Sequence, residues 1–366
     1  MSQLSTTIGQ DAQPSPGEQE DTCTPAALAE AAGLVYVSDS EPGFQRRRAG
    51  RGFTYVDPKG QVVRDLALRE RFQTLAIPPA WCEVWICANP AGHLLVTGRD
   101  EAGRKQYIYH PRWRAMRNQA KYDRLRLFGE ALPKLRAHVQ ADLRQRALTR
   151  EKVTALVVNL LEETLIRIGN EEYARQHETY GLTTLQDEHV AVNGAAVVFE
   201  FRGKSGKDHE IMITDRRLAR LVQACQELPG QQLFQYRDDN DAVCGLTSTQ
   251  VNEYLRQVTG CDFTAKDFRT WGGTVTAARL LHEVGPSPTQ KEADQQIVQV
   301  IKGVAERLGN TPAVCRQHYI HPAILDSYRA GQLSALYADV AAQKATAPGL
   351  AEDEAVVHAL LSQAGE

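Results

Sequence analysis

The spacing of apolar residues along this 366-residue chain changes near residue 120. Before that point, short apolar stretches are separated by turn signals such as Asp57-Pro58-Lys59-Gly60, a pattern typical of β-strands. After it, apolar residues recur every three or four positions over long stretches, which is typical of α-helices. Strands followed by helices favour an α+β fold built from two lobes.

The first part reads as a β-rich lobe with few helices. We predict one short helix near residues 66 to 75 and strands at residues 52 to 56, 81 to 88, 94 to 97 and 106 to 110.

The second part reads as helical, with one sheet inserted. We predict helices over residues 123 to 147 and 151 to 168, the second stopped by Gly169. Asn193-Gly194 is a hairpin turn signal, and a second tight loop at residues 203 to 207 leads to a third strand, so we expect a three-stranded antiparallel sheet. Later helices should begin at Thr264, which forms a capping box with Asp267, and at Thr289, with Gly309 ending the latter.

Charge is unevenly distributed, although the formal net charge is only −3. Residues 1 to 45 hold seven acidic side chains and no Lys or Arg, and residues 336 to 366 hold five acidic side chains and one Lys. Residues 46 to 124 instead hold sixteen Lys or Arg against seven acids, interleaved with Phe53, Tyr55, Tyr107, Tyr109 and Trp113. Cations mixed with aromatic side chains suit contact with phosphates, sugars and bases, so the map favours a nucleic-acid partner.

These patterns divide the chain into four parts. We expect a disordered acidic arm at residues 1 to 30, a β-rich basic lobe at 31 to 120, a mostly helical lobe at 121 to 335, and an acidic C-terminal tail at 336 to 366.

Several function classes find no support. No apolar run approaches the roughly 18 residues of a membrane span, and the first residues do not look like a signal peptide, so we expect no membrane partner and a cytoplasmic protein. The seven cysteines are scattered without a C-x-x-C pair, and His318-x-x-His321 lacks neighbouring ligands, so we predict no metal site. Phosphate-binding, dinucleotide-binding and serine-hydrolase loops are absent from the sequence, and we expect no cofactor.

Four cationic or phenolic residues stand in unusual settings. Arg167 follows an apolar helical stripe, Arg269 lies near a helix start, Lys204 sits at a glycine-flanked hairpin tip, and Tyr319 follows Gly309-Asn310-Thr311-Pro312. Each alone fits an ordinary structural role, such as a snorkelling side chain or a packed aromatic.

Taken in order, the set resembles the type IB DNA topoisomerases, specifically their poxvirus-like branch in bacteria. The resemblance covers about residues 44 to 330. Its motifs are Arg51-Gly52-Phe53-Thr54-Tyr55, Ala76-Ile77-Pro78-Pro79-Ala80-Trp81, Thr97-Gly98-Arg99-Asp100, Gly103-Arg104-Lys105-Gln106-Tyr107-Ile108-Tyr109, Ile166-Arg167-Ile168-Gly169-Asn170, Glu178-Thr179-Tyr180-Gly181-Leu182-Thr183-Thr184-Leu185, Gly203-Lys204, Lys266-Asp267-Phe268-Arg269-Thr270 and Gly309-Asn310-Thr311-Pro312.

The resemblance implies relaxation of supercoiled DNA, without ATP or metal, through a transient 3′-phosphotyrosyl link in one strand. Tyr319 would be the nucleophile, Arg167 and Arg269 would clamp the scissile phosphate, and Lys204 would be the general acid. These residue types suit the chemistry, because guanidinium groups neutralise a phosphorane bidentately and an alkoxide leaving group needs a proton, which a lysine of lowered pKa can supply. Viral members carry His where this chain has Asn310, whose amide could still donate to a non-bridging oxygen.

The family also implies contacts to double-stranded DNA in the amino-terminal lobe. If residues 105 to 109 are extended, Lys105, Tyr107 and Tyr109 share one face, and Arg104 and Gln106 the other. We predict these five residues, with Tyr173 from the catalytic lobe, as DNA contacts. Two lobes around a duplex would form a C-shaped clamp, acting as a monomer and associated with the nucleoid.

Two alternatives stay open at the level of sequence. A tyrosine recombinase shares the catalytic order, but recombinases have His three residues before the second arginine, where this chain has Lys266, and their amino-terminal domain is helical. A non-catalytic DNA-binding protein on the same fold would form no covalent adduct with DNA.

Overall fold

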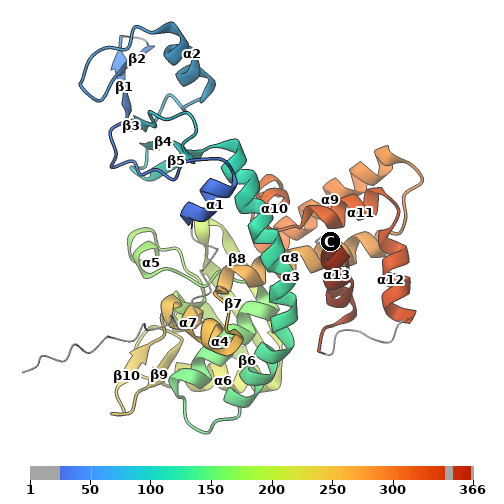
Figure 1. The fold of residues 1–366 in the computed structure, drawn as a ribbon. Helices are drawn as coiled ribbons and strands as arrows, with labels where there is room; N and C mark the ends of the chain where they lie inside the picture. The colour runs from blue at the N-terminus through green and yellow to red at the C-terminus, as the bar shows by residue number, and fades with distance from the viewer. Residues whose placement is uncertain (1–24, 51, 343–348, 364–366) are drawn as a thin grey trace, which may run out of the picture. The chain divides into compact units, whose positions relative to one another are not determined.

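The computed structural model describes residues 25–50, 52–342 and 349–363, and its chain divides into two compact units, Met1–Gln119 and Ala120–Glu366 (Figure 1). The fold is α+β, as predicted: the first unit is rich in strands and the second in helices. Within the described residues, no helix is long and apolar enough to cross a membrane, and no cluster of His, Cys, Asp or Glu is placed to hold a metal ion.

The first unit is an antiparallel sheet with two short helices. Its five strands lie in the order β2-β1-β3-β4-β5. The elements are α1 (Pro25–Ala31), β1 (Phe44–Ala49), β2 (Gly52–Val56), α2 (Leu66–Thr74), β3 (Cys82–Ile86), β4 (Leu94–Arg99) and β5 (Lys105–Tyr109). Phe72 of α2 is fully buried against Val84, Ile86 and Val96 of the sheet. The predicted strands and helix are present, and β1 is an additional strand that the sequence reading missed.

The composition of β1 explains why the sequence did not predict this strand. It carries Arg46, Arg47 and Arg48, and three consecutive charges hide the apolar alternation by which a strand is recognised. The strand pairs with β2 and β3 on its two sides, so it lies inside the sheet despite this composition.

The second unit surrounds a large apolar core with helices and one three-stranded sheet. A long helix, α3 (Pro111–Asp142), begins in the first unit and continues into the second. The other elements are α4 (Arg150–Thr164), α5 (Glu171–His177), β6 (Val190–Asn193), β7 (Ala196–Arg202), β8 (Asp208–Thr214), α6 (Arg216–Gln226), β9 (Gln235–Arg237), β10 (Val243–Gly245), α7 (Ser248–Thr259), α8 (Ala265–Val284), α9 (Gln290–Leu308), α10 (Pro312–His318), α11 (Pro322–Arg329), α12 (Leu333–Ala342) and α13 (Glu352–Gln363), with short 3-10 turns at Leu182–Thr184, Asp187–His189 and Lys204–Gly206.

Most predicted boundaries in this unit agree with the structure, and three do not, one of them being the end of α3, which lies at Asp142 rather than 147. The sheet β6-β7-β8 and the caps at Thr264, Thr289 and Gly309 are as predicted. Helix α3 begins at Pro111 rather than 123, since a proline suits the first turn of a helix. Helix α4 ends at Thr164 rather than 168, because Leu165 takes a left-handed conformation with φ of 55°.

Both predicted acidic ends contain ordered structure. Residues 1 to 24 lie outside the described residues, but α1 occupies the end of the expected arm, where Ala29 packs with Trp113. The expected tail is also wrong for residues 336 to 342 and 349 to 363, because α12 and α13 bury Val356 and Val357 in the core of the second unit. The acidic side chains of these helices made the segment read as a polar tail and hid the apolar spacing that indicates a buried helix.

Candidate active site

The end of α4 positions the first candidate arginine. After the left-handed turn at Leu165, the chain is held by a neighbouring segment. The Leu182 N–H donates to the Arg167 carbonyl at 2.9 Å, and the Thr183 N–H donates to the Ile168 carbonyl at 2.7 Å. These bonds fix the backbone of Arg167, whose half-buried side chain projects from the end of the helix.

Lys204 lies at the tip between β7 and β8. The Gly203 N–H donates to the Lys207 carbonyl at 2.7 Å and closes the loop. Within it, Ser205 and Gly206 have φ angles of 66° and 70°, so the tip turns through left-handed conformations. Lys204 itself is exposed. A closed loop with an exposed lysine leaves the ammonium able to reach a ligand while its backbone is held.

Arg269 is buried near the start of α8, with only 4% of its surface exposed. Its guanidinium donates to the Leu165 carbonyl and, at 2.7 Å, to the Leu308 carbonyl. These two carbonyls lie at the C-terminal ends of α4 and α9. Carbonyls at helix C-termini lack partners inside the helix and carry partial negative charge. The second candidate arginine therefore stabilises two helix ends and is stabilised by them.

Tyr319 ends α10, a helix with Thr311 as its N-cap and Pro312 in its first turn. Its carbonyl accepts from the Thr274 hydroxyl of α8 at 3.3 Å. A Cβ atom added at Gly273 would lie 2.6 Å from that carbonyl oxygen. The tyrosine backbone thus lies directly on α8, about one helical turn beyond Arg269.

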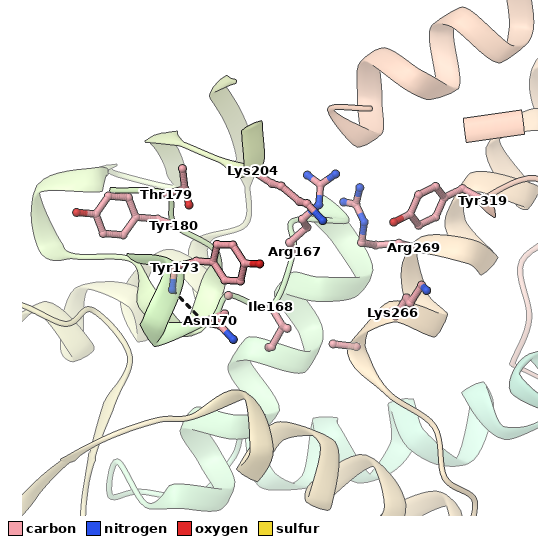
Figure 2. A pocket seen from close by; sticks show the side chains of 12 residues that line it. Arg167, Ile168, Asn170, Tyr173, Thr179, Tyr180, Lys204, Lys266, Arg269 and Tyr319 are labelled. Atoms are coloured by element: carbon pink, nitrogen blue, oxygen red, sulfur yellow. Dashed lines mark hydrogen bonds between the residues drawn. The ribbon is translucent and has the colours of Figure 1, made fainter. Parts of the chain in front are cut away.

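A cavity of about 430 Å³ joins these residues, and Arg167, Lys204, Arg269 and Tyr319 all lie in its lining. In Figure 2, Lys204 and Arg167 extend toward Arg269, and the Tyr319 hydroxyl points toward Arg269 from the other side. The guanidinium carbon of Arg269 is 5.2 Å from the centre of the Tyr319 ring. Four side chains from four different segments of the chain thus converge on one space in the second unit.

The electrostatic environment of this cavity is strongly positive. Burial lowers the pKa of Arg269 to about 10, with a further lowering by Arg167 and an opposing effect of Tyr319. Burial also lowers the pKa of Arg167, again opposed by Tyr319. Guanidinium groups stay protonated in proteins, so both arginines are charged at neutral pH. Burial and these two arginines lower the pKa of the nearby His209. The positive electrostatic potential of this cavity favours the binding of an anion.

Asn310 lies beside the cavity and contacts Arg167. Its Oδ1 accepts from Arg167 Nη2 at 2.5 Å. Because a guanidinium only donates, this bond fixes the amide orientation and leaves Nδ2 as the other atom. Nδ2 is enclosed and has no hydrogen-bond partner among the described residues. Asn310 contacts Arg167 but is not itself part of the lining.

The residues predicted to contact DNA in the first unit lie on β5 and the turn before it. Three of them pair with carboxylates: Lys105 Nζ lies 2.5 Å from Asp39, while Arg104 and Gln106 both contact Asp100, at 2.8 Å and 2.9 Å. The lysine and the glutamine therefore face opposite sides of the strand, in agreement with the alternation read from the sequence.

The three tyrosines predicted as DNA contacts differ in exposure. Tyr107 is 47% exposed and stacks on Tyr109, with ring centres 5.9 Å apart. Tyr109 is half-buried and packs against the apolar cluster that contains Leu34 and Trp113. Trp113, part of the aromatic set interleaved with the basic residues, is buried and belongs to the core. Tyr173 is 51% exposed and lies in the lining of the cavity in the second unit.

Two further residues had no assigned function from sequence. Lys266 also lies in the cavity lining, three residues before Arg269 on α8. That spacing puts both side chains on one helix face, a signal available in the sequence. Asp100 accepts hydrogen bonds from both Arg104 and Gln106, which the motif Gly98-Arg99-Asp100 alone did not indicate.

Comparison with known protein families gives matches over most of the chain. Residues 110–346 match the family described as eukaryotic DNA topoisomerase I, catalytic core. Residues 52–100 match the N-terminal domain of bacterial DNA topoisomerase IB. The first match contains Arg167, Lys204, Arg269, Asn310 and Tyr319.

Individual relatives agree with these families. DNA topoisomerase 1B of Acanthamoeba polyphaga mimivirus is 29% identical over 297 residues, covering 78% of this chain and 88% of the viral protein. DNA topoisomerase 1B of vaccinia virus (strain Copenhagen) is 26% identical over 242 residues, 64% of this chain and 72% of the relative. DNA topoisomerase 1 of Drosophila melanogaster is 26% identical over 185 residues, 48% of this chain and 18% of the relative.

Proposed function

This chain belongs to the type IB DNA topoisomerase family, whose enzymes relax supercoiled DNA, and we propose that Tyr319, Arg167, Arg269 and Lys204 carry out its cleavage and resealing steps. The observation that carries the proposal is the single cavity lined by a phenol, two charged guanidinium groups and an exposed lysine.

The cleavage step exchanges one phosphoester for another. The Tyr319 oxygen attacks the scissile phosphorus, the bond to the 5′-oxygen breaks, and the phenolic proton passes to water. Arg167 and Arg269 neutralise the charge that develops on the non-bridging oxygens. Lys204 donates a proton to the departing 5′-oxygen, which is a poor leaving group when unprotonated. Resealing is the reverse reaction, with the DNA 5′-hydroxyl as nucleophile.

This scheme requires neither ATP nor a metal ion. The energy of the broken phosphodiester is retained in the tyrosyl phosphoester, so resealing needs no external source of energy. The charge stabilisation that a metal ion would provide comes from two side chains that stay protonated throughout. All four residues belong to one chain, which supports a monomeric enzyme. Its substrate being DNA, we propose that it works at the nucleoid.

We further propose a supporting role for Asn310. Its Oδ1 orients Arg167, and its enclosed Nδ2 is a donor for a non-bridging phosphate oxygen. A buried donor without a partner is unfavourable, and a phosphate oxygen that reaches it would remove that cost.

The amino-terminal unit is proposed to hold the duplex. Arg104 and Lys105 suit phosphates, Gln106 suits a base edge, and Tyr107 offers an exposed ring, with Tyr109 stacked behind it. Tyr173, exposed at the cavity, suits the DNA backbone near the scissile phosphate.

Trapping of a covalent adduct tests the reaction and the nucleophile together. We expect the native chain to relax supercoiled plasmid in buffer with EDTA and without ATP, and to give a denaturation-resistant protein–DNA adduct. Tyr319→Phe should abolish both while binding DNA normally, because it removes only the attacking oxygen. An adduct formed by Tyr319→Phe would exclude Tyr319 as the nucleophile, and strand exchange between two sites without relaxation would favour a recombinase.

A further inference from the structure

The turn between β4 and β5 contains a carboxylate that makes more contacts than its turn requires. Asp100 Oδ1 accepts from the backbone N–H groups of Ala102 and Arg104, at 3.0 Å and 2.9 Å. Asp100 Oδ2 accepts from two side chains: from Arg104 through Nε at 2.9 Å and Nη2 at 2.8 Å, and from Gln106 Nε2 at 2.9 Å. One oxygen shapes the turn and the other holds two predicted DNA contacts.

A second turn in the same unit, at Asp57, has the backbone contacts but not the contacts to side chains. Asp57 Oδ1 accepts from the N–H groups of Lys59 and Gln61, at 2.9 Å and 2.8 Å, with the same residue spacing as at Asp100. In the part of the chain that the structure describes, these are the hydrogen bonds of the Asp57 side chain. The turn therefore forms without the second set of contacts, which at Asp100 must serve another purpose.

The contact with Asp100 fixes which way the Gln106 amide faces. A carboxylate oxygen only accepts, so the group 2.9 Å from it must be the amide nitrogen and not the amide oxygen. The charge of Asp100 is secured by Arg104, whose hydrogen bond is the largest cause of the lowered pKa of that carboxyl. The reversed amide would place two acceptors against each other. Gln106 consequently keeps Oε1 and one N–H for other partners.

We propose that Asp100 is a positioning residue that sets the base preference of Gln106, by keeping the amide oxygen of Gln106 as its outward acceptor. The proposal rests on the proposed function, in which Gln106 contacts a base edge. An outward acceptor pairs with a base that presents an amino group in the major groove, which means adenine or cytosine. Guanine and thymine present a keto oxygen there, which repels it.

One substitution reverses this polarity without removing the turn. In Asp100→Asn, the remaining oxygen can still accept both backbone N–H groups, while an NH₂ group replaces Oδ2. Gln106 must then direct Oε1 toward that NH₂ group and present its own NH₂ outward. We expect the preference to change from amino bases to keto bases.

The test is the sequence profile of trapped adducts on a pool of duplexes with random sequence. For the native chain, we expect enrichment of amino bases at one position, which Gln106→Ala should lose. Asp100→Asn should shift the amino-to-keto ratio at that same position by about fivefold or more, the lower end of what one base contact contributes. Asp57→Asn, the matched turn control, should give the native profile.

Asp100→Asn also loses the contact with Arg104, but this loss should not alter the amino-to-keto ratio that the experiment measures. A released arginine that binds phosphate changes total adduct yield and salt dependence, but it acts almost uniformly across sequences. The ratio of amino to keto bases at one position therefore reports on the orientation of the Gln106 amide alone. In the double variant with Gln106→Ala, Asp100→Asn should have no further effect on that ratio.

The possible outcomes distinguish a failure of this inference from a failure of the proposed function on which it rests. A native profile for Asp100→Asn, or a shift that persists without the Gln106 amide, overturns the role of Asp100 while adduct formation stands. A native profile for Gln106→Ala removes Gln106 from base contact, and with it the role of Asp100. Absence of any adduct from the native chain overturns the proposed function itself. Melting temperatures of Asp100→Asn and Asp57→Asn should both change little, because both variants keep the backbone bonds of their turns and the Arg104 ion pair lost in Asp100→Asn is solvent-exposed.

Discussion

Arginines in this protein are buried for different reasons, which their neighbours reveal. Arg46 is 9% exposed and donates to the carbonyls of Ile77, Pro78 and Trp81, so it holds the first unit together and is not available to DNA. Arg269 is 4% exposed and also donates to carbonyls, but it is in addition one of the residues that line the cavity. A guanidinium has five N–H donors, so Arg269 can support two helix ends and still bind an anion.

Asn310 gives the first prediction at the scale of a residue. Asn310→Ala should lower the single-turnover cleavage rate by roughly 10²- to 10³-fold, the usual effect of losing one donor to a charged transition state. The rate is measured with a pre-bound duplex, so that binding does not contribute. An unchanged rate would remove Asn310 from the site.

A second variant separates the two atoms of that amide. Asn310→Asp keeps an oxygen that accepts from Arg167 but lacks the N–H. A loss as large as that of the alanine variant would identify the donor as the missing function. Recovery to near the native rate would instead assign Asn310 to the positioning of Arg167.

At the scale of an element, α8 organises the candidate active site. Lys266 and Arg269 lie in its first turns, and Gly273 and Thr274 hold the backbone of Tyr319 one turn later. Helix α8 therefore carries one proposed phosphate-binding arginine and also holds the backbone of the proposed nucleophile. Their separation depends on how closely α10 approaches α8.

Gly273 sets that approach, which gives a prediction for the element. Gly273→Ala places a Cβ atom 2.6 Å from the Tyr319 carbonyl oxygen, so the end of α10 must move. We expect the cleavage rate to fall by about tenfold or more, since displacements near 1 Å from reacting geometry cost up to roughly 10²-fold. Single-turnover cleavage and DNA affinity should be measured together, and affinity should change little.

Gly303 is the matched control, a glycine inside α9. An added Cβ atom there has Leu280 as its nearest neighbour at 3.8 Å. Gly303→Ala should keep the native rate and stabilise the protein by about 0.5–1 kcal/mol, because alanine loses less conformational freedom in a helix. Native cleavage by Gly273→Ala would show that the contact with α8 does not position Tyr319.

The C-terminal helix α13 shows how an element can be hidden by its composition. Its first turn is acidic, but Glu354 points inward and contacts Arg136 and Trp271. Burial opposes its charge, yet hydrogen bonds from Arg136, Ala351 and Trp271 hold its pKa below the usual value. A carboxylate that reads as a tail residue is therefore a partner that the core requires.

At the scale of the whole molecule, charge is divided along the chain. Residues 1 to 24 contain Asp11, Glu18, Glu20 and Asp21 and no Lys or Arg, whereas residues 46 to 124 carry a surplus of nine basic side chains. Acidic residues that compete with phosphates for these cations would weaken non-specific binding. The net charge of −3 does not reveal that an acidic segment and a basic segment lie in different parts of the chain.

Removal of residues 1 to 24 tests that competition. The truncation should raise affinity for non-specific DNA at low salt, and the difference should fall as salt screens the charges, since the Debye length shortens from about 10 Å at 0.1 M to about 3 Å at 1 M. Truncation at residue 24 leaves α1 intact. A full-length variant with the four acids replaced by amides should behave in the same way, and coincident salt titrations for all three proteins would discard the idea.

The sequence by itself determined the fold class, the main caps and the ordered set of motifs. These depend on local rules, such as the period of apolar residues, glycine at turns, and a capping box at Thr264. Resemblance to a known family then named Tyr319 and its partners as candidates. The missed strand β1 and the ordered helix α13 show where this reading fails, because charged side chains hide apolar alternation when their burial is supported by distant partners.

Only the tertiary structure decided which charged groups meet. Arg167, Lys204, Arg269 and Tyr319 lie more than 150 residues apart at their extremes, yet they line one cavity. Arg46 and Arg47 are neighbours in sequence, yet one is buried and the other exposed. Asp100 contacts Gln106, and Asn310 contacts Arg167, through hydrogen bonds that no local pattern specifies. The physical reason is that helix and strand formation depend on neighbours along the chain, whereas the field and donors of a site depend on neighbours in space.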